Sequence, residues 1–190
     1  VVVPAHWRED LDGGFLASFK GKVHRLDGLH GHVHLVPHRR PSKVSNPPRI
    51  VVRRLNGDGI HDADEIVSLP EDALDGVAIT VADEGAYQGS PWDLDRELAA
   101  HDGVITQSVT LASEAVLMGT PTLLISSAHR GFLDRLENEG APLFRWRGQS
   151  DKAEWGAVHA QFLAGLHLTD ALEPAEWPDA KRQLAALFNS

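Results

Sequence analysis

Short apolar runs alternate with longer segments of mixed polarity from residue 49 to residue 146. The apolar runs have the length of strands and are rich in β-branched residues; they are RIVVRRL (49–55), GVAITVAD (76–83), GVITQ (103–107), PTLLIS (121–126) and APLFRW (141–146). A strand that is buried on both faces reads as a continuous apolar run, because neither face meets water. The runs therefore predict five buried strands, as is typical of a parallel sheet.

The segments between and after these runs have the apolar spacing of helices. They are DLDRELAAH (93–101), TLASEAVLMG (110–119), HRGFLDRLENEG (129–140), residues 151–167 and residues 178–188. Gly119 and Gly140 are helix stop signals, and Pro178 is suited to the first position of the last helix, where no N–H partner is needed. Strands that alternate with helices predict βαβ units. We expect an α/β fold with a Rossmann-like doubly wound parallel sheet.

The first 48 residues carry weaker patterns. They predict a strand at 1–3 that Pro4 ends, loops with a short helix at 5–20, a β-like run HVHLV at 32–36 and a Pro/Ser linker PSKVSNPP at 41–48. The chain begins without methionine and within a β-like run, so we expect a fragment with upstream sequence missing. Residues 1–48 would then be the end of a missing N-terminal domain plus linker, and residues 49–190 the C-terminal domain.

Composition and charge exclude several classes of protein. Of the 190 residues, 42% are hydrophobic and 24% are charged, which is typical of a globular protein. The net charge of −9, with acidic and basic residues interspersed, argues against a nucleic-acid-binding surface. No apolar run approaches the ~20 residues needed to cross a bilayer, so we expect a cytoplasmic protein that is not an integral membrane protein. The absence of cysteine excludes disulfides and thiolate metal ligands.

Five histidines fall within HRLDGLHGHVHLVPH (24–38) and raise the question of a metal site. Alternate residues of a strand share a face, so His30, His32 and His34 on a strand are placed to bind zinc, and the string resembles the Asp-x-His-x-His element of metal-dependent amidohydrolases. Such a barrel needs ~250 residues and eight βα units, and no second histidine pair follows a later strand. We interpret these histidines as partly exposed side chains of an edge strand or linker, with a zinc-dependent hydrolase as the alternative.

The run DGVITQSVTLASEAVLMGTPTLLIS (102–126) carries the most information on function. It predicts a strand, a polar turn, a helix, a glycine stop and a strand. Ser108 and Thr110 are N-cap candidates, and the free N–H groups and positive dipole of such a helix start favour an anion. Glu114 lies one turn beyond Thr110, about 6 Å along the axis. At the carboxyl edge of a parallel sheet, this carboxylate is placed to accept hydrogen bonds from two ribose hydroxyls; the alternative is a surface glutamate that stabilises the helix.

The pattern S-x-T-x-x-x-E-A-x-x-x-G-T-P at 108–121 resembles the signature helix of the GT-B superfamily. Within that superfamily, the chain resembles the archaeal and bacterial family called domain of unknown function three-five-four, which is related to UDP-N-acetylglucosamine 2-epimerases and to the glycosyltransferase that makes lipid II. The resemblance extends to DGLHGHVHLVP (27–37), VVRRLNGDGIHD (51–62) and GFLDRLENEGAPLFRW (131–146). His30 matches a family histidine, whereas His32 and His34 stand where the family has leucine and tyrosine. This comparison implies no shared metal site at the histidines.

The resemblance implies a nucleotide-sugar-binding domain of a GT-B-like glycosyltransferase or UDP-sugar epimerase, with a UDP-sugar or similar nucleotide-sugar as the partner. The residues that it assigns to substrate binding are Glu114 at the ribose, Ser108 and Thr110 at the diphosphate, and Arg53, Arg54 and Asp62 across the cleft. His61 is the residue to which we assign proton transfer. GT-B enzymes usually act without a bound metal, so the resemblance implies neither a metal nor another cofactor.

Several alternatives stay open from the sequence. The chemistry implied by the resemblance is either inverting sugar transfer or C2 epimerisation through elimination of UDP. A missing N-terminal half favours a different class, a non-catalytic truncated module that only binds a sugar nucleotide. The oligomeric state is also open, with a homodimer among the alternatives.

Overall fold

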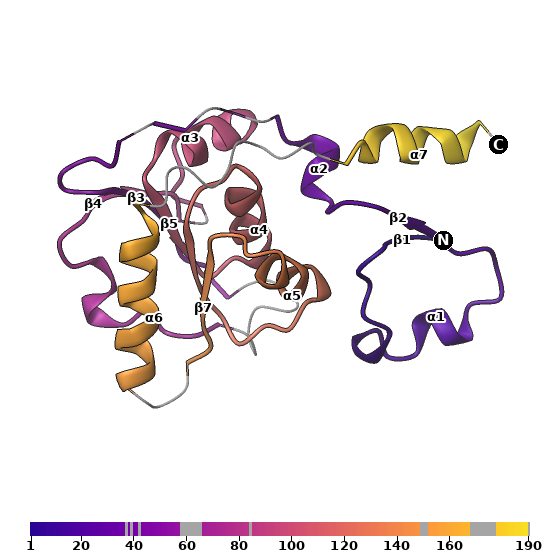
Figure 1. The fold of residues 1–190 in the computed structure, drawn as a ribbon, viewed down its shortest axis with the longest axis horizontal. Coiled ribbons are helices and arrows are strands. Elements are labelled where there is room, and N and C mark those ends of the chain that lie inside the picture. Colours follow the sequence, from indigo (N-terminus) through magenta and orange to yellow (C-terminus); the bar gives the residue numbers. More distant parts are fainter. Residues whose placement is uncertain are drawn as a thin grey trace.

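Five parallel strands form one sheet, which lies among the helices in the left-hand part of the molecule in Figure 1. The computed structural model describes residues 1–36, 38, 40–41, 43–57, 66–83, 85–148, 152–167 and 178–189. The strands are β3 Arg49–Arg53, β4 Ala78–Val81, β5 Gly103–Thr106, β6 Thr122–Ile125 and β7 Leu143–Trp146. Their order in the sheet is β4-β3-β5-β6-β7, and each neighbouring pair is parallel. Each strand lies within a predicted apolar run, and the predicted α/β fold with a Rossmann-like doubly wound sheet is confirmed. The prediction that all five strands are buried is wrong for β4, because it lies at the edge of the sheet with Ile79 and Val81 exposed.

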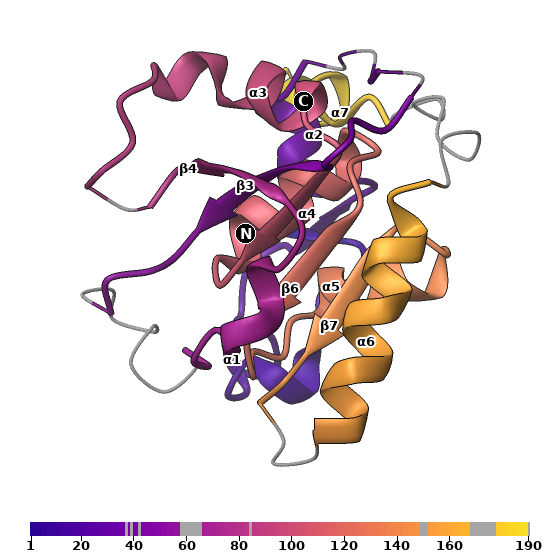
Figure 2. The same cartoon turned by 90° about the vertical axis from the view of Figure 1, so that its left-hand side faces the viewer.

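Helices cover both faces of this sheet (Figure 2). They are α6 (Lys152–Gly165) on one face, and α3 (Leu94–Ala100), α4 (Val109–Leu117) and α5 (Gly131–Asn138) on the other. Successive strand residues point to opposite faces, so Ile105 and Leu123 pack with Phe162 of α6, whereas Val104 and Leu124 pack beneath the other three helices. Burying such a side chain contributes about 1.5–3 kcal/mol. We call the described part of residues 49–167 the sheet body.

The order in which successive strands are added to the sheet reverses at β3. β4 is added on one side of β3, whereas β5, β6 and β7 follow in turn on the other side. Two single-turn helices precede β4 and α3; they are η2 (Glu71–Leu74) and η3 (Pro91–Asp93). In doubly wound sheets, ligands bind outside the carboxyl ends of the strands at such a switch point. Here that point lies between β3 and β5, where Arg53 is in register with Thr106.

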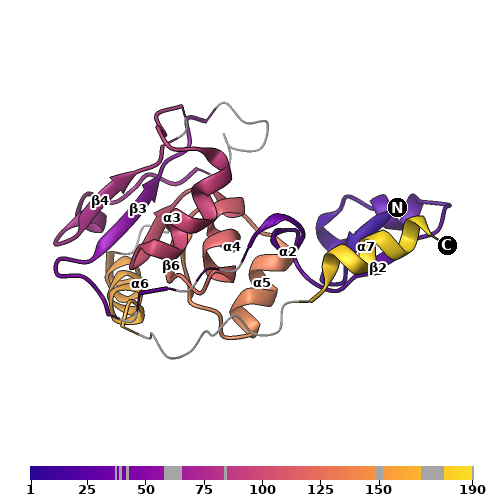
Figure 3. The ribbon, with the colours of Figure 1, turned by 90° about the horizontal axis from the view of Figure 1, so that it is seen from above.

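The first 36 residues and the last helix form a second unit beside the sheet body (Figure 3). Its elements are β1 (Val2–Pro4), η1 (Glu9–Leu11), α1 (Phe15–Ser18), β2 (His24–Leu26), α2 (Gly31–His34) and α7 (Ala180–Phe188). β1 and β2 pair in parallel, and α7 packs against both β2 and α2. The Gln183 side chain of α7 accepts the N–H of Asp27 at 2.8 Å and donates to its carbonyl at 3.2 Å. We call residues 1–36 with α7 the N-terminal lobe.

Two predictions for this lobe are wrong. HVHLV at 32–36 does not form a β-like run, because residues Gly31–His34 form one helical turn in which the Leu35 N–H donates to the Gly31 carbonyl at 2.9 Å. Contact with α4 favours this turn: a Cβ on Gly31 would lie 2.7 Å from Leu117 Cδ1. The last helix begins at Ala180 rather than with Pro178 at its first position, because the Asp179 carboxylate is the N-cap that accepts the Arg182 N–H at 2.8 Å.

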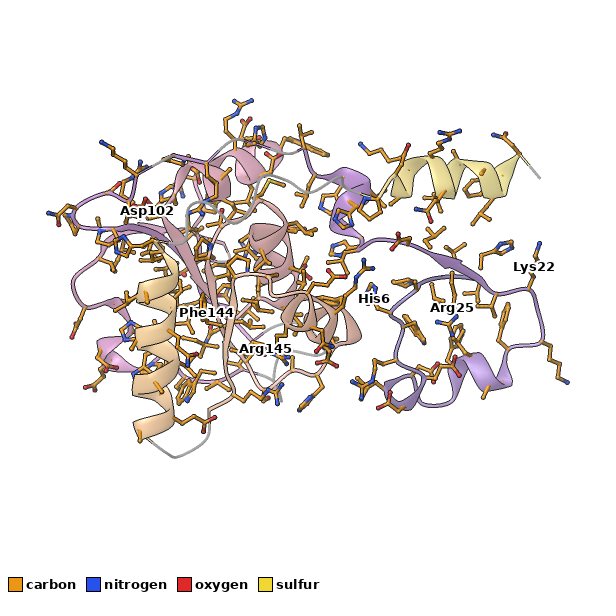
Figure 4. All side chains as sticks on the ribbon, in the orientation of Figure 1. His6, Lys22, Arg25, Asp102, Phe144 and Arg145 are labelled. Atoms are coloured by element: carbon orange, nitrogen blue, oxygen red, sulfur yellow. The ribbon has the colours of Figure 1, made fainter. Side chains whose placement is uncertain are left out.

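Asp102 attaches the predicted linker to the amino edge of the sheet (Figure 4). This residue precedes β5 and is 3% exposed, and its Oδ2 accepts the N–H groups of Ser45 at 3.2 Å and Arg49 at 2.7 Å. The Arg40 guanidinium donates to the carbonyls of Asp102 at 2.9 Å and Gly119 at 2.7 Å. The domain boundary at residue 48 stays a prediction. In the part of the chain that the structure describes, no helix has the length and apolar character needed to span a membrane.

Candidate functional site

The start of α4 lies at the switch point between β3 and β5. Ser108 is its N-cap, as the sequence predicted: the Ser108 Oγ accepts the N–H of Leu111 at 3.3 Å, and the Ser108 N–H donates to Thr106 Oγ1 at 2.9 Å. Thr110 is exposed in the first turn. The N–H groups of Val109 and Thr110 have no hydrogen-bond partner among the described residues. This helix start therefore presents unpaired donors and a positive dipole end.

Arg53 and Arg54 end β3 and make hydrogen bonds to the end of β4. Arg53 Nη1 donates to the Ala82 carbonyl at 3.1 Å, and the Arg54 N–H and Nε donate to the two oxygens of Asp83, each at 2.8 Å. Burial raises the pKa of the Asp83 carboxyl, but the hydrogen bonds from Arg54 outweigh this and leave that pKa below its ordinary value. The structure thus brings Arg53 beside Thr106 and the start of α4, whereas Arg54 is paired with Asp83.

Gln107 is a site residue that the sequence did not single out. It follows β5 directly, is 7% exposed, and its Oε1 accepts the N–H of Leu55 at 2.9 Å while its Nε2 donates to the Val67 carbonyl at 2.7 Å. Gln107 therefore holds two segments together at the edge where a ligand of a doubly wound sheet lies. The available signal was a polar residue at the end of an apolar run. His61 and Asp62, the predicted proton-transfer residue and one of the predicted binding residues, lie outside the described residues.

Glu114 lies against two of the histidines where α4 contacts α2. Its side chain is 13% exposed, and its Oε1 is 3.0 Å from His34 Nε2 and 3.8 Å from His30 Nε2. The His30 and His34 rings have centroids 5.3 Å apart. Burial lowers the pKa of His30; Glu114 opposes this shift and His34 adds to it. The His32 ring does not join this cluster, since its Nδ1 accepts the N–H of Leu29 at 2.8 Å.

A cavity of about 840 Å³ lies between the N-terminal lobe and the start of α5. Its lobe side includes Trp7 and Phe15, its body side is residues 129–132, and His30 also reaches it. The lining combines aromatic rings with imidazole and guanidinium groups. Such a mixture of apolar surface and a few polar groups is suited to a small molecule with a flat ring and a negative charge.

His6 is a half-buried titratable group in the wall of this cavity (Figure 4). Its ring packs edge-on against Phe132 with centroids 6.3 Å apart, and its Nδ1 is buried without a hydrogen-bond partner in the described chain. Burial, followed by the positive charge of Arg135, lowers the pKa of His6 to about 4, while Glu139 and Asp27 oppose the shift. The imidazole is therefore neutral at pH 7.

The predicted binding residues do not line this cavity directly. Its wall includes His30 but not Glu114, and it does not include the residues at the start of α4. His30 nevertheless joins the two places, because its Nε2 is 3.8 Å from the Glu114 carboxylate. The switch point and the Glu114 cluster therefore share α4, and His30 belongs both to that cluster and to the wall of the cavity.

Comparisons with known proteins assign no family to this chain. No protein-family model matches it, and no curated protein matches it either. The function is therefore inferred from the geometry of the site together with the resemblance of its motifs.

Proposed function

We propose that this chain is the nucleotide-sugar-binding domain of a GT-B-like glycosyltransferase or of a UDP-sugar epimerase. The observation that carries the proposal is the start of α4 at the switch point between β3 and β5. Doubly wound sheets bind ligands at that point, and a helix start with unpaired N–H groups binds phosphate. The hydroxyls of Ser108 and Thr110 lie beside those N–H groups, so we place the diphosphate there.

Glu114 is then the acceptor for the ribose hydroxyls. Both imidazoles of its cluster are directed to Oε1, and Oε2 has no hydrogen-bond partner within the described part of the chain. Along α4, Glu114 follows Thr110 by about 6 Å, which is comparable to the span from a diphosphate to the ribose hydroxyls. One carboxylate oxygen is therefore available to the nucleotide while the other stays with the histidines.

The cavity provides room for the rest of the ligand or for an acceptor. Its aromatic side chains, Trp7 and Phe132 among them, suit the apolar face of a sugar ring. His61 and Asp62 keep the roles that the resemblance assigns to them as part of this proposal. The choice between sugar transfer and C2 epimerisation also belongs to the proposal, and so does the cytoplasm as its location.

Calorimetry with UDP and UDP-N-acetylglucosamine tests the donor site. A hydrogen bond to a charged group contributes about 1.5–3 kcal/mol, so Glu114→Gln should weaken binding about ten- to a hundredfold. Glu71→Gln is the matched control, because Glu71 is an exposed glutamate of η2 that belongs neither to α4 nor to the histidine cluster, and this change should leave the affinity unchanged. Equal affinities in wild type and Glu114→Gln would contradict the ribose role. Failure of the wild type to bind either nucleotide would overturn the proposed function.

Product analysis separates an enzyme from a module that only binds. Incubation of the chain with UDP-N-acetylglucosamine should give the C2 epimer if the chain is an epimerase, or UDP and free N-acetylglucosamine if it is a transferase that uses water as the acceptor. Recovery of unchanged ligand by a protein that binds it would instead support the non-catalytic module.

A further inference from the structure

The cluster of His30, His34 and Glu114 points to a second binding activity. We propose that these three side chains bind a divalent transition-metal ion of the zinc class, with at least one coordination position left open. Their ligand atoms all lie within 4.8 Å of one another. Two imidazole nitrogens and one carboxylate oxygen suit zinc, cobalt or nickel, whereas magnesium and calcium prefer sites made of oxygen alone.

The separations between the ligand atoms fit one ion. Zinc binds nitrogen and oxygen ligands at about 2.0–2.2 Å in a tetrahedral arrangement, which places neighbouring ligand atoms about 3.4 Å apart. The distances from Glu114 Oε1 to the Nε2 atoms of His34 and His30, 3.0 Å and 3.8 Å, lie on either side of that value. The His30 and His34 side chains are 50% and 49% exposed, so small rotations complete the geometry without a change in the backbone.

Local structure places all three groups on facing surfaces. His30, the N-cap of α2, has helical backbone angles (φ −60°, ψ −32°), so it lies one full turn before His34 on the same face. A pair of histidines at positions i and i+4 of a helix is a known arrangement for zinc. Gly31 brings this turn against Leu117 of α4, one turn along from Glu114, which sets the distance between the histidines and the carboxylate.

His30, His34 and Glu114 are not the set of side chains that a strand at 30–34 would bring together. On a strand, His30, His32 and His34 would share one face, and we expected no metal there. The helical turn changes the set of residues: His32 is directed to the Leu29 N–H, and Glu114, 80 residues after His34, completes the group. A metal on Glu114 Oε1 leaves Oε2 available, so the site is compatible with the proposed ribose contact. Because His30 also lines the cavity, the proposed metal site lies beside the cavity.

Zinc titration of the metal-free full chain by calorimetry, without nucleotide, tests the site. The wild type should bind one equivalent. Loss of a partner that only orients a metal ligand lowers affinity about 10–100-fold, so His30→Ala, His34→Ala and Glu114→Gln should each lower it by at least about a hundredfold. His32→Asn is the matched control, because the asparagine Oδ1 can still accept the Leu29 N–H, and its zinc affinity should equal that of the wild type.

Two further measurements make the result specific. Cobalt(II) should give the intense visible absorption of a four-coordinate site and lose it in His34→Ala, whereas magnesium should not compete with zinc. Melting curves of the metal-free variants establish that each one folds. Zinc affinity that is unchanged in both histidine variants, or no saturation at one equivalent, would overturn the proposal. Because the titration contains no nucleotide, its failure is distinct from a failure to bind UDP.

Discussion

The sheet body and the N-terminal lobe differ in how they bury apolar side chains. In the sheet body, the strands contribute side chains such as Val51 and Leu124 with 0% exposure. Among the described residues, twelve large hydrophobic side chains are exposed, and nine of them belong to the lobe. These nine are Val1, Val2, Trp7, Leu11, Phe15, Phe19, Val23, Val36 and Phe188. The body therefore has a dry core, and the lobe is mostly surface.

Polar contacts hold the lobe together instead. The Asp12 carboxylate accepts the indole N–H of Trp7 at 2.9 Å and the backbone N–H groups of Gly14 and Phe15 at 2.8 Å and 3.1 Å. Arg8 is paired with Asp134 of α5, which joins the lobe to the body. Exposed ion pairs contribute only about 0–1 kcal/mol each. Because these polar contacts are weak, the lobe should open locally at a lower free energy than the body unfolds. The cavity lies between the two regions.

Replacing one phenylalanine in each region should give the largest difference in the free energy of unfolding. Phe162 is fully buried between α6 and the sheet, so Phe162→Ala should lower the free energy of unfolding by about 3–5 kcal/mol. Phe188 of α7 is 83% exposed, and Phe188→Ala should change it by less than about 0.5 kcal/mol. Urea unfolding followed by circular dichroism measures both. Similar losses in the two variants would show that the lobe shares the core of the body.

A smaller effect, dependent on pH, is expected at the border. The pKa of His6 is about 4 in the folded state against an ordinary 6.5, so between these values the unfolded chain binds more protons. The contribution of the neutral His6 to folding stability is therefore fully present above pH 6.5 and is lost as the pH falls towards 4. The expected loss at pH 5 is roughly 1–2 kcal/mol. Phe at position 6 cannot titrate, so amide hydrogen exchange in residues 1–36, measured relative to the sheet body at each pH, should accelerate on acidification in the wild type but not in His6→Phe. Parallel profiles from pH 7.5 to 4.5 would contradict a buried neutral His6.

Removing the N-cap of one helix in each region should have a smaller effect on stability than the changes above. Ser108 caps α4 in the body and Asp179 caps α7 in the lobe, each by accepting one backbone N–H. Loss of an N-cap costs about 1 kcal/mol, so Ser108→Ala should lower the free energy of global unfolding by that amount. Asp179→Ala should leave global unfolding unchanged and accelerate amide hydrogen exchange only in α7 and the residues it covers. Faster exchange throughout the sheet in Asp179→Ala would show instead that the two regions unfold together.

The sequence predicts the body well because each of its elements carries a local signal. The strands are apolar on both faces, and Gly119 and Gly140 end their helices with φ of 76° and 72°, where a side chain would be strained. Ser108 was recognisable as an N-cap because the capping group lies next to the helix that it caps. Nothing local marks Asp102, whose carboxylate accepts N–H groups from residues more than 50 positions earlier.

The lobe and the histidine cluster were harder to predict because both depend on contacts between segments that are distant in the sequence. β2 has few apolar residues and forms because β1 supplies a partner backbone. Residues 30–34 were predicted to have the period of a strand, but they form a helical turn. The packing of Gly31 against Leu117 favours that turn, and it could not be predicted because it joins segments that are distant in the sequence. Glu114 was predicted to bind the ribose of a nucleotide, whereas its pairing with His30 and His34 follows from that turn. Because a strand period was predicted there, the predicted set of neighbouring histidines was wrong.

The contact between α7 and β2 also dictates when the lobe can be completed during synthesis. Asp27 and Gln183 are 156 positions apart, so the hydrogen bonds that join them cannot form until Gln183 has been synthesised and has left the ribosome. At about 5–20 residues per second, that interval is on the order of ten seconds or more. Meanwhile the strands of the body, whose partners lie nearer in the sequence, can pair. The surfaces of β2 and α2 that α7 covers in the folded protein stay open to solvent during this interval.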